Sequence, residues 1–259
     1  MVSVYAFAAA AVALVSTTNA LQSEVIAASL PEGEYYRPTG DSVSGRVDAT
    51  TPFRRTPCPG LNALANHGYL PRDGLNVKKT ELKAAVMKYY NIDDSAASTL
   101  TSTLPETFDL NYLGTHGFIE HDASLAHADT YFGKDPAAVD SELLEDMYSR
   151  FTDEGVLGVQ QLGELRKDRL ASCKAQNPNC TFVERQVFLA YGETAFLLNG
   201  LGDIATNTID KDTFQSFVEF ERIPEGFERP TQLTAQILLS TSAKVQAAAT
   251  AAAKVEVSA

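Results

Sequence analysis

The chain has 259 residues, of which 44% are hydrophobic and 21% are charged, and its formal net charge is -12. This length and composition suffice for one domain with a sizeable core. The acidic balance argues against nucleic acid and anionic membrane surfaces as partners, because both would repel the protein.

The first twenty residues predict a secretory signal peptide. Residues 4–15 form an apolar run that is too short to span a bilayer, and residues 16–20 are small and suited to cleavage. No basic residue lies near Met1. We expect residues 1–20 to be removed, the protein to be secreted and extracellular, and the mature chain to have no transmembrane helix.

The rest of the chain predicts an all-α fold, a single multi-helix domain over residues 21–230. Residues 21–56 are rich in Pro, Gly, Ser and Thr, which predicts an extended arm over the domain surface. The chain has no run of alternating β-branched residues long enough to predict a sheet. After the first short helix near residue 60, apolar periodicity and capping residues predict helices over 80–90, 93–104, 119–131, 141–151, 158–175, 181–198 and 210–222.

Cys58 lies between two prolines at the start of that first helix. Pro57 holds Cys58 extended, and Pro59 suits the first helical position. The sulfur then faces the amides of Gly60 and Leu61, so we expect a thiolate, which is a soft metal ligand. A lone cysteine is more often a small buried apolar residue, and a cysteine hydrolase is a further alternative that lacks an obvious paired base.

Glu120 and Ser124 are four residues apart in the predicted helix 119–131. Their oxygens would lie one turn apart on one face, which suits a hard cation such as Mg²⁺. His121 is rotated by one residue, so only its backbone carbonyl could join the cation. The alternative is an acidic helix start that favours the helix dipole and binds nothing.

Cys173 and Cys180 flank the turn-forming residues 177–179. A disulfide across this turn would contribute about 2 to 3 kcal/mol in the chain-entropy model. The alternative is a pair of free thiols, and pairing leaves Cys58 as the odd, free cysteine. Asn179 also begins a glycosylation sequon.

Glu193 lies on the predicted helix 181–198, on a face that it shares with apolar residues such as Phe196. Desolvation should raise its pKa, so that the carboxyl group can take and return a proton. The alternatives are a surface glutamate or one that pairs with Arg185, eight residues away. Glu184 is a weaker competitor for the same role.

The remaining features carry no predicted chemistry. The alanine-rich tail, residues 231–259, is either a surface helix or a removable extension. His67 lies in the turn that ends the first helix, where we expect a structural role. His116 and His127 lack the i, i+4 partner of a helical zinc site, and we assign them no chemistry.

Three motifs together resemble the haem-thiolate peroxidases, the family of chloroperoxidase and the unspecific peroxygenases. They are PCPGLNALANHGYLPRDG at residues 57–74, EHDAS at residues 120–124, and Glu193 followed two positions later by a small residue and then a phenylalanine. The motifs appear in the family's order and span most of the predicted domain. The histidine in the second motif is typical of the short peroxygenases.

The resemblance implies a role for each site residue. Cys58 would ligate the iron of haem b as a thiolate, and Glu193 would carry a proton between the oxygens of hydrogen peroxide, oriented by His121. Glu120, the His121 carbonyl and Ser124 would bind Mg²⁺ or Mn²⁺ beside a haem propionate. The implied fold is helical, with the haem between proximal and distal helices.

We therefore expect a secreted peroxygenase with peroxidase side activity on small apolar or aromatic substrates. Ile119 stands where chloroperoxidase has a phenylalanine, which predicts a wider distal pocket and places a dedicated haloperoxidase second. The candidate walls of that pocket, which core packing would explain equally well, are Val183, Leu189, Phe196 and Leu197. A non-catalytic secreted protein that binds haem or a host surface is the alternative from another class.

Overall fold

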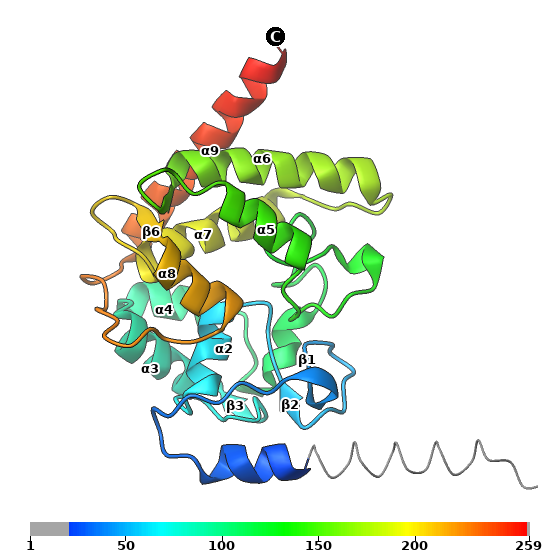
Figure 1. Cartoon of the computed structure of the whole chain (residues 1–259), viewed down its shortest axis with the longest axis vertical. Coiled ribbons are helices and arrows are strands. Elements are labelled where there is room, and N and C mark those ends of the chain that lie inside the picture. Colours follow the sequence, from blue (N-terminus) through cyan, green and yellow to red (C-terminus); the bar gives the residue numbers. More distant parts are fainter. Residues whose placement is uncertain (1–20, 258–259) are drawn as a thin grey trace, which may run out of the picture.

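The computed structural model describes residues 21–257 and is mostly helical, in agreement with the predicted class (Figure 1). The predicted signal peptide, residues 1–20, lies outside the described residues. Within the described part, no helix combines the length and apolar character needed to cross a membrane. The named α-helices are α2 (Pro59–Asn66), α3 (Lys79–Tyr90), α4 (Asp94–Thr101), α5 (Ser141–Ser149), α6 (Val159–Gln176), α7 (Glu184–Gly200), α8 (Lys211–Phe214) and α9 (Ala235–Val257).

Short strands join parts of the chain that the sequence did not predict to pair. Strands β1 (Val43–Ser44) and β2 (Phe53–Arg54) are parallel, whereas β3 (Val77–Lys78) and β4 (Thr107–Phe108) are antiparallel. Strands β5 (Val156–Gly158) and β6 (Thr208–Asp210) are also antiparallel, with Leu157 opposite Ile209. Each strand has two or three residues, too few to leave an alternating pattern in the sequence.

Most predicted helices form close to their expected bounds, and side-chain caps fix the starts of several of them. Asp93 accepts a hydrogen bond from the Ala96 amide at the start of α4, and Asp140 caps α5 in the same way. The helix predicted over 210–222 is shorter: α8 ends at Phe214 and a π-helical turn, η4 (Gln215–Glu219), follows. Residues 21–29 are helical, where we expected an extended arm.

The helix predicted over 119–131 does not form. Residues 121–129, hereafter the distal loop, have no regular structure, and Ala123 has a positive φ of 59°. A short 3₁₀ turn, η3 (Thr130–Phe132), follows. Ala123 and Ser124 direct their carbonyls to buried arginines on α6 instead of to amides one turn later. Long-range hydrogen bonds have overridden the local helical pattern.

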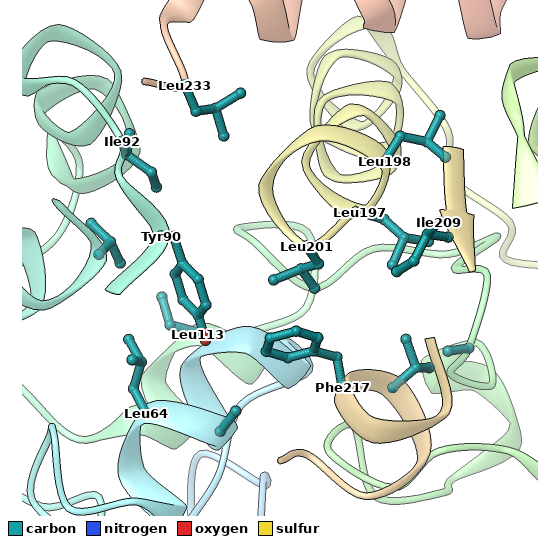
Figure 2. Packing of buried hydrophobic residues seen from close by; sticks show 14 of the residues in the cluster. Leu64, Tyr90, Ile92, Leu113, Leu197, Leu198, Leu201, Ile209, Phe217 and Leu233 are labelled. Atoms are coloured by element: carbon teal, nitrogen blue, oxygen red, sulfur yellow. The ribbon is translucent and has the colours of Figure 1, made fainter. Parts of the chain in front are cut away.

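The core lies where α2, α3, the end of α7 and η4 meet. Figure 2 shows Tyr90, Leu201 and Phe217 converging from these elements, with Leu64 of α2 nearby. Tyr90 packs edge-on against Phe217 at 6.1 Å between ring centroids, and its hydroxyl donates to the Gly60 carbonyl at 2.6 Å. The first turn of α2 is therefore fixed against the core.

The alanine-rich tail forms α9, which packs against both α6 and α7. At Gly163 of α6, an added Cβ would lie 2.6 Å from the Cβ of Ala248, so only glycine allows this close approach. Val245 and Ala249 of α9 are buried. Of the two states that the sequence left open for the tail, the structure shows a helix packed against α6 and α7.

Candidate active site

Cys58 is the N-cap residue of α2. Its backbone is extended (φ -87°, ψ 107°), and Pro59 begins the helix, as predicted. The amides of Gly60 and Leu61 donate hydrogen bonds to its sulfur, also as predicted. Cys58 is the free cysteine among the described residues.

The segment before Cys58 is held by one side chain of α2. Asn62 accepts a hydrogen bond from the Thr56 amide at 2.9 Å and donates to the Thr56 carbonyl at 2.7 Å. Asn62 also donates to Glu221, and it is 1% exposed. This contact closes a six-residue loop around Cys58, so the position of the thiol relative to α2 follows from local sequence.

Burial raises the pKa of Cys58 to about 11. The amides of Leu61 and Gly60 oppose this rise, whereas the nearby Glu193 carboxylate adds to it. The expected thiolate is therefore wrong for the polypeptide alone, because desolvation outweighs two amide hydrogen bonds. A metal ion at the sulfur reverses this balance, since a coordinating thiol loses its proton.

Glu120 and Ser124 do not share a helical face, because the segment is not helical. The Glu120 side chain is 4% exposed, and its Oε2 lies 2.7 Å from Nδ1 of His116. Burial raises the pKa of Glu120, and His116 partly opposes that rise. Ser124 Oγ lies 3.4 Å from Nδ1 of His127. The helical premise of the cation site is wrong, and the ligand set stays a prediction.

Two buried arginines of α6 hold the distal loop. Arg166 donates to the Ala123 carbonyl at 3.2 Å, and Arg169 donates to the Ser124 carbonyl at 2.7 Å. Arg169 also forms an ion pair with Asp129 at 3.3 Å. The loop therefore depends on a helix more than forty residues later in the sequence for its shape.

His121 lies inside the protein and faces Glu193. Its ring is 2% exposed, its Nε2 lies 3.2 Å from Oε2 of Glu193, and its Nδ1 lies 2.7 Å from the Asp122 carbonyl. Burial by itself lowers the pKa of His121, but the charge and hydrogen bond of Glu193, together with the Asp122 carbonyl, raise it overall. The structure thus brings together the two residues predicted to act on peroxide.

The pKa of Glu193 is lowered, which contradicts our expectation. Desolvation raises it, but the charge and hydrogen bond of His121 and the charges of Arg166 and His127 together outweigh desolvation. Arg166 lies 3.9 Å from Oε2 of Glu193. The carboxyl group is therefore ionised at neutral pH and is poised to accept a proton first.

Arg185 does not pair with Glu193. Its guanidinium lies over the ring of Phe118 at 4.9 Å from the centroid. Among the described residues, the ion-pair partners of Glu193 are His121 and Arg166. The alternative of an Arg185 pair is therefore wrong.

Arg166 connects α7 to the distal loop and is the main residue that the sequence interpretation missed. It donates to Thr194 Oγ1 at 2.8 Å and to the Ala190 carbonyl at 2.7 Å, on either side of Glu193. Burial lowers its pKa to about 10. A signal was present in the sequence: Arg166 and Arg169 share the helical spacing of Leu162 and Leu165, on a face of α6 that is otherwise apolar.

The three histidines other than His121 have different contacts. His67 is structural, as predicted: its ring nitrogens contact the Gly33 carbonyl at 2.8 Å and the Ile223 amide at 3.2 Å. His116 and His127, to which we assigned nothing, contact two of the predicted cation ligands. Burial lowers the pKa of His127 to about 4, so it is neutral. The four-residue spacing of His116 and Glu120 was the available signal.

The predicted pocket-wall residues fall into two groups. Phe196 packs edge-on against Tyr90 at 5.9 Å, and Leu197 is buried in the core. Val183 is 61% exposed, and Leu189 is half-buried. Their contact with substrate stays a prediction.

The residues present fit a thiolate-ligated haem. Desolvation by the surrounding protein is the largest influence on the pKa of both Cys58 and Glu193. Both side chains nevertheless keep accessible surface: Cys58 is half-buried, and the Glu193 side chain is 47% exposed. Beside it, the Cβ position of Gly192 has no atom within 4 Å. A soft sulfur donor and a proton carrier are thus both accessible and within electrostatic reach of each other.

Comparison with known proteins agrees with this donor set. The family model "Peroxidase, family 2" matches residues 34–232, most of the described chain. The chain belongs to this family of haem-thiolate peroxidases. Membership implies haem iron as the cofactor.

Relatives within the family are peroxygenases and peroxidases. The chain is 33% identical to the aromatic peroxygenase of Cyclocybe aegerita over 77% of its own length and 62% of that protein's. It is 29% identical to the aromatic peroxygenase of Coprinellus radians over 55% of this chain and 64% of the relative. A 41-residue match to the chloroperoxidase of Leptoxyphium fumago is 49% identical and covers 16% of this chain and 11% of that protein. The chain thus spans less than two thirds of these relatives' lengths.

Proposed function

We propose that this protein is a secreted enzyme that uses hydrogen peroxide to oxygenate or oxidise small apolar and aromatic molecules at a haem-thiolate centre. The observation that carries the proposal is the His121–Glu193 pair, 3.2 Å apart, whose carboxylate also raises the pKa of the free thiol of Cys58. The names of the two aromatic peroxygenases support the same reaction class.

Haem, when bound, supplies the redox chemistry of peroxide activation. Cys58 would hold the iron, and the amides of Gly60 and Leu61 would stabilise the negative charge on its sulfur. Because these amides belong to the first turn of α2, they need no rearrangement to do so. The prolines on either side keep the sulfur at the helix mouth.

Glu193 is the proposed general base and then general acid. Its lowered pKa keeps the carboxylate ready to take a proton from one oxygen of hydrogen peroxide. It then returns that proton to the other oxygen, which leaves as water. His121 orients the carboxylate through its Nε2, and such a proton carrier contributes about two to four orders of magnitude in rate.

The proposed second cofactor is Mg²⁺ or Mn²⁺, held by the Glu120 carboxylate, the His121 carbonyl and the Ser124 hydroxyl. All three donors are oxygens, which suits a hard cation. His116 and His127 would have to give up their contacts with Glu120 and Ser124. Removal of the cation by a chelator should then loosen the distal loop, which proteolysis within residues 121–129 can detect.

The test compares two reactions of the purified holoprotein with peroxide. We expect hydroxylation or epoxidation of a small aromatic molecule to be faster than chloride-dependent chlorination of a diketone. Fast chlorination with little oxygen insertion would favour a haloperoxidase instead. A protein that binds haem but turns over neither substrate would be a non-catalytic haem-binding protein, and a mature N-terminus near residue 21 in a secreting host would support export.

A further inference from the structure

The disulfide between Cys173 and Cys180 lies next to the distal loop. It closes the end of α6 into a tight turn, hereafter the disulfide turn, residues 173–180. Within it, the Asn177 amide donates to the Cys173 carbonyl at 2.8 Å, and the Cys180 amide donates to the Asn177 carbonyl at 3.0 Å. The turn is therefore rigid, and the chain that leaves it at Thr181 has a fixed starting point.

The disulfide turn binds a carboxylate near each end of the distal loop. Immediately after the turn, the Thr181 amide donates to Asp122 at 2.9 Å. Inside the turn, the Asn177 side chain donates to Asp129 at 3.2 Å. Both aspartates are buried, at 1% and 2% exposed, so water has little access to their carboxylates.

These contacts reach His121 directly. The Asp122 carbonyl lies 2.7 Å from Nδ1 of His121, and Phe182 touches the His121 ring edge-on at 5.9 Å between centroids. The two residues after Cys180 thus contact both the neighbour of His121 and its ring. The opposite nitrogen of that ring faces Glu193.

The Asp122 contact has no substitute. Its Oδ1 is buried without a hydrogen-bond partner among the described residues, and its carboxylate lies within 4.8 Å of both disulfide sulfurs. Its other oxygen is bound by the amide and hydroxyl of Thr181. If the turn shifts, no second donor is on hand to keep Asp122 in place.

We propose that the disulfide turn is a positioning element for His121. The Cys173–Cys180 bond fixes Thr181 and Phe182, which in turn fix the His121 ring against Glu193. This role rests on the proposed function of the His121–Glu193 pair. On this proposal the disulfide keeps His121 oriented for proton transfer, in addition to stabilising its own short loop.

The experiment compares the double variant Cys173→Ser/Cys180→Ser with Asp122→Ala, in the haem-loaded protein. The serine variant frees the disulfide turn that holds Thr181, whereas Asp122→Ala removes the carboxylate that Thr181 binds and keeps the disulfide. We expect kcat for peroxide-dependent turnover to fall between about 10-fold and 100-fold in both, as for a misplaced catalytic group. The KM for the organic substrate and the thiolate-haem absorption should not change, because Cys58 is untouched.

Hydrogen exchange gives a readout that does not depend on activity. Amides of residues 121–129 should exchange faster in both variants. Asp122→Asn keeps an oxygen acceptor for the Thr181 amide and should recover most of kcat. Gln176→Ala, an exposed position within the same closed turn, is the matched control and should behave as wild type.

The proposal fails if Asp122→Ala keeps the kcat of the wild type and its hydrogen exchange in residues 121–129, whatever is measured for the double serine variant. It also fails if both variants lose haem together with kcat, which would mark a role in folding alone. If the wild-type protein does not turn over peroxide, the proposed function is wrong. Hydrogen exchange in the variants would still show whether the disulfide turn holds the distal loop in place.

Discussion

The thiol side and the proton-transfer side of the candidate site are built in different ways. Cys58 is placed by neighbours in sequence: two prolines, the amides of α2 and the Asn62 side chain. His121 is placed by residues far away, on α6, directly after the disulfide turn and on α7. One half is a local motif, and the other is a meeting point of distant segments.

This difference has a physical consequence. A local motif keeps its geometry as long as its own helix is folded, because few loop-closing contacts are needed. The distal loop depends on buried charges and hydrogen bonds whose loss leaves unpaired groups behind. Substitutions on the two sides should therefore separate thiolate ligation from proton transfer.

The largest effect should come from Glu193→Gln, which keeps shape but removes the proton carrier. We expect peroxide-dependent turnover to fall by about two to four orders of magnitude. The thiolate-haem spectrum should stay as in the wild type, since Cys58 is not altered. Glu184→Gln, an exposed position at the start of α7, is the control and should keep full turnover. Equal losses in both variants would contradict the assignment.

Arg166→Met should be the most destabilising change on the distal side. It removes four contacts of a buried guanidinium and leaves Glu193 with one cationic partner fewer, at a cost of about 3 to 5 kcal/mol in the free energy of unfolding. Denaturant unfolding measures this loss. A change below about 1 kcal/mol, the range of an exposed ion pair, would mean that the distal loop does not depend on α6.

Asn62→Ala probes the thiol side in the same way. It leaves the buried Thr56 amide and carbonyl without partners and should cost about 1 to 3 kcal/mol. Here we expect the thiolate-haem absorption to shift, while hydrogen exchange in residues 121–129 stays unchanged. Faster exchange in the distal loop would show that the thiol side and the proton-transfer side are coupled rather than independent.

Asp93→Ala is the control for general destabilisation of the fold. It removes the N-cap of α4, far in sequence from both sides, and should cost about 1 kcal/mol. Turnover per haem and the haem spectrum should both be unchanged. Any specific loss of turnover would show that general destabilisation alone can reproduce the effects expected of the other variants.

The same contrast explains how much could be predicted from the sequence. The helical class, most helix positions, the extended Cys58 and the Cys173–Cys180 pairing all follow from local signals. The helix expected at 119–131 does not form, because its carbonyls bind Arg166 and Arg169. No local pattern in that segment reveals partners forty residues away.

The electrostatic predictions fail for a related reason. The sequence predicts a lowered pKa for Cys58, but this pKa is raised, because burial depends on the whole fold and not on the two visible amides. The sequence predicts a raised pKa for Glu193, but this pKa is lowered, because no local pattern reveals that Arg166 lies beside it. The four-residue spacing of His116 and Glu120 is visible in the sequence, but the contact of His127 with Ser124 lies in a loop that no helical spacing displays.

The most direct test of thiolate ligation by Cys58 is the absorption spectrum of the reduced, carbon monoxide-bound holoprotein, measured for the wild type and for Cys58→Ala. We predict that the wild type shows the strongly red-shifted Soret band of thiolate-ligated haem and that Cys58→Ala does not. A wild-type band at the position typical of histidine ligation, or no Soret band at all after expression with ample haem, would contradict it.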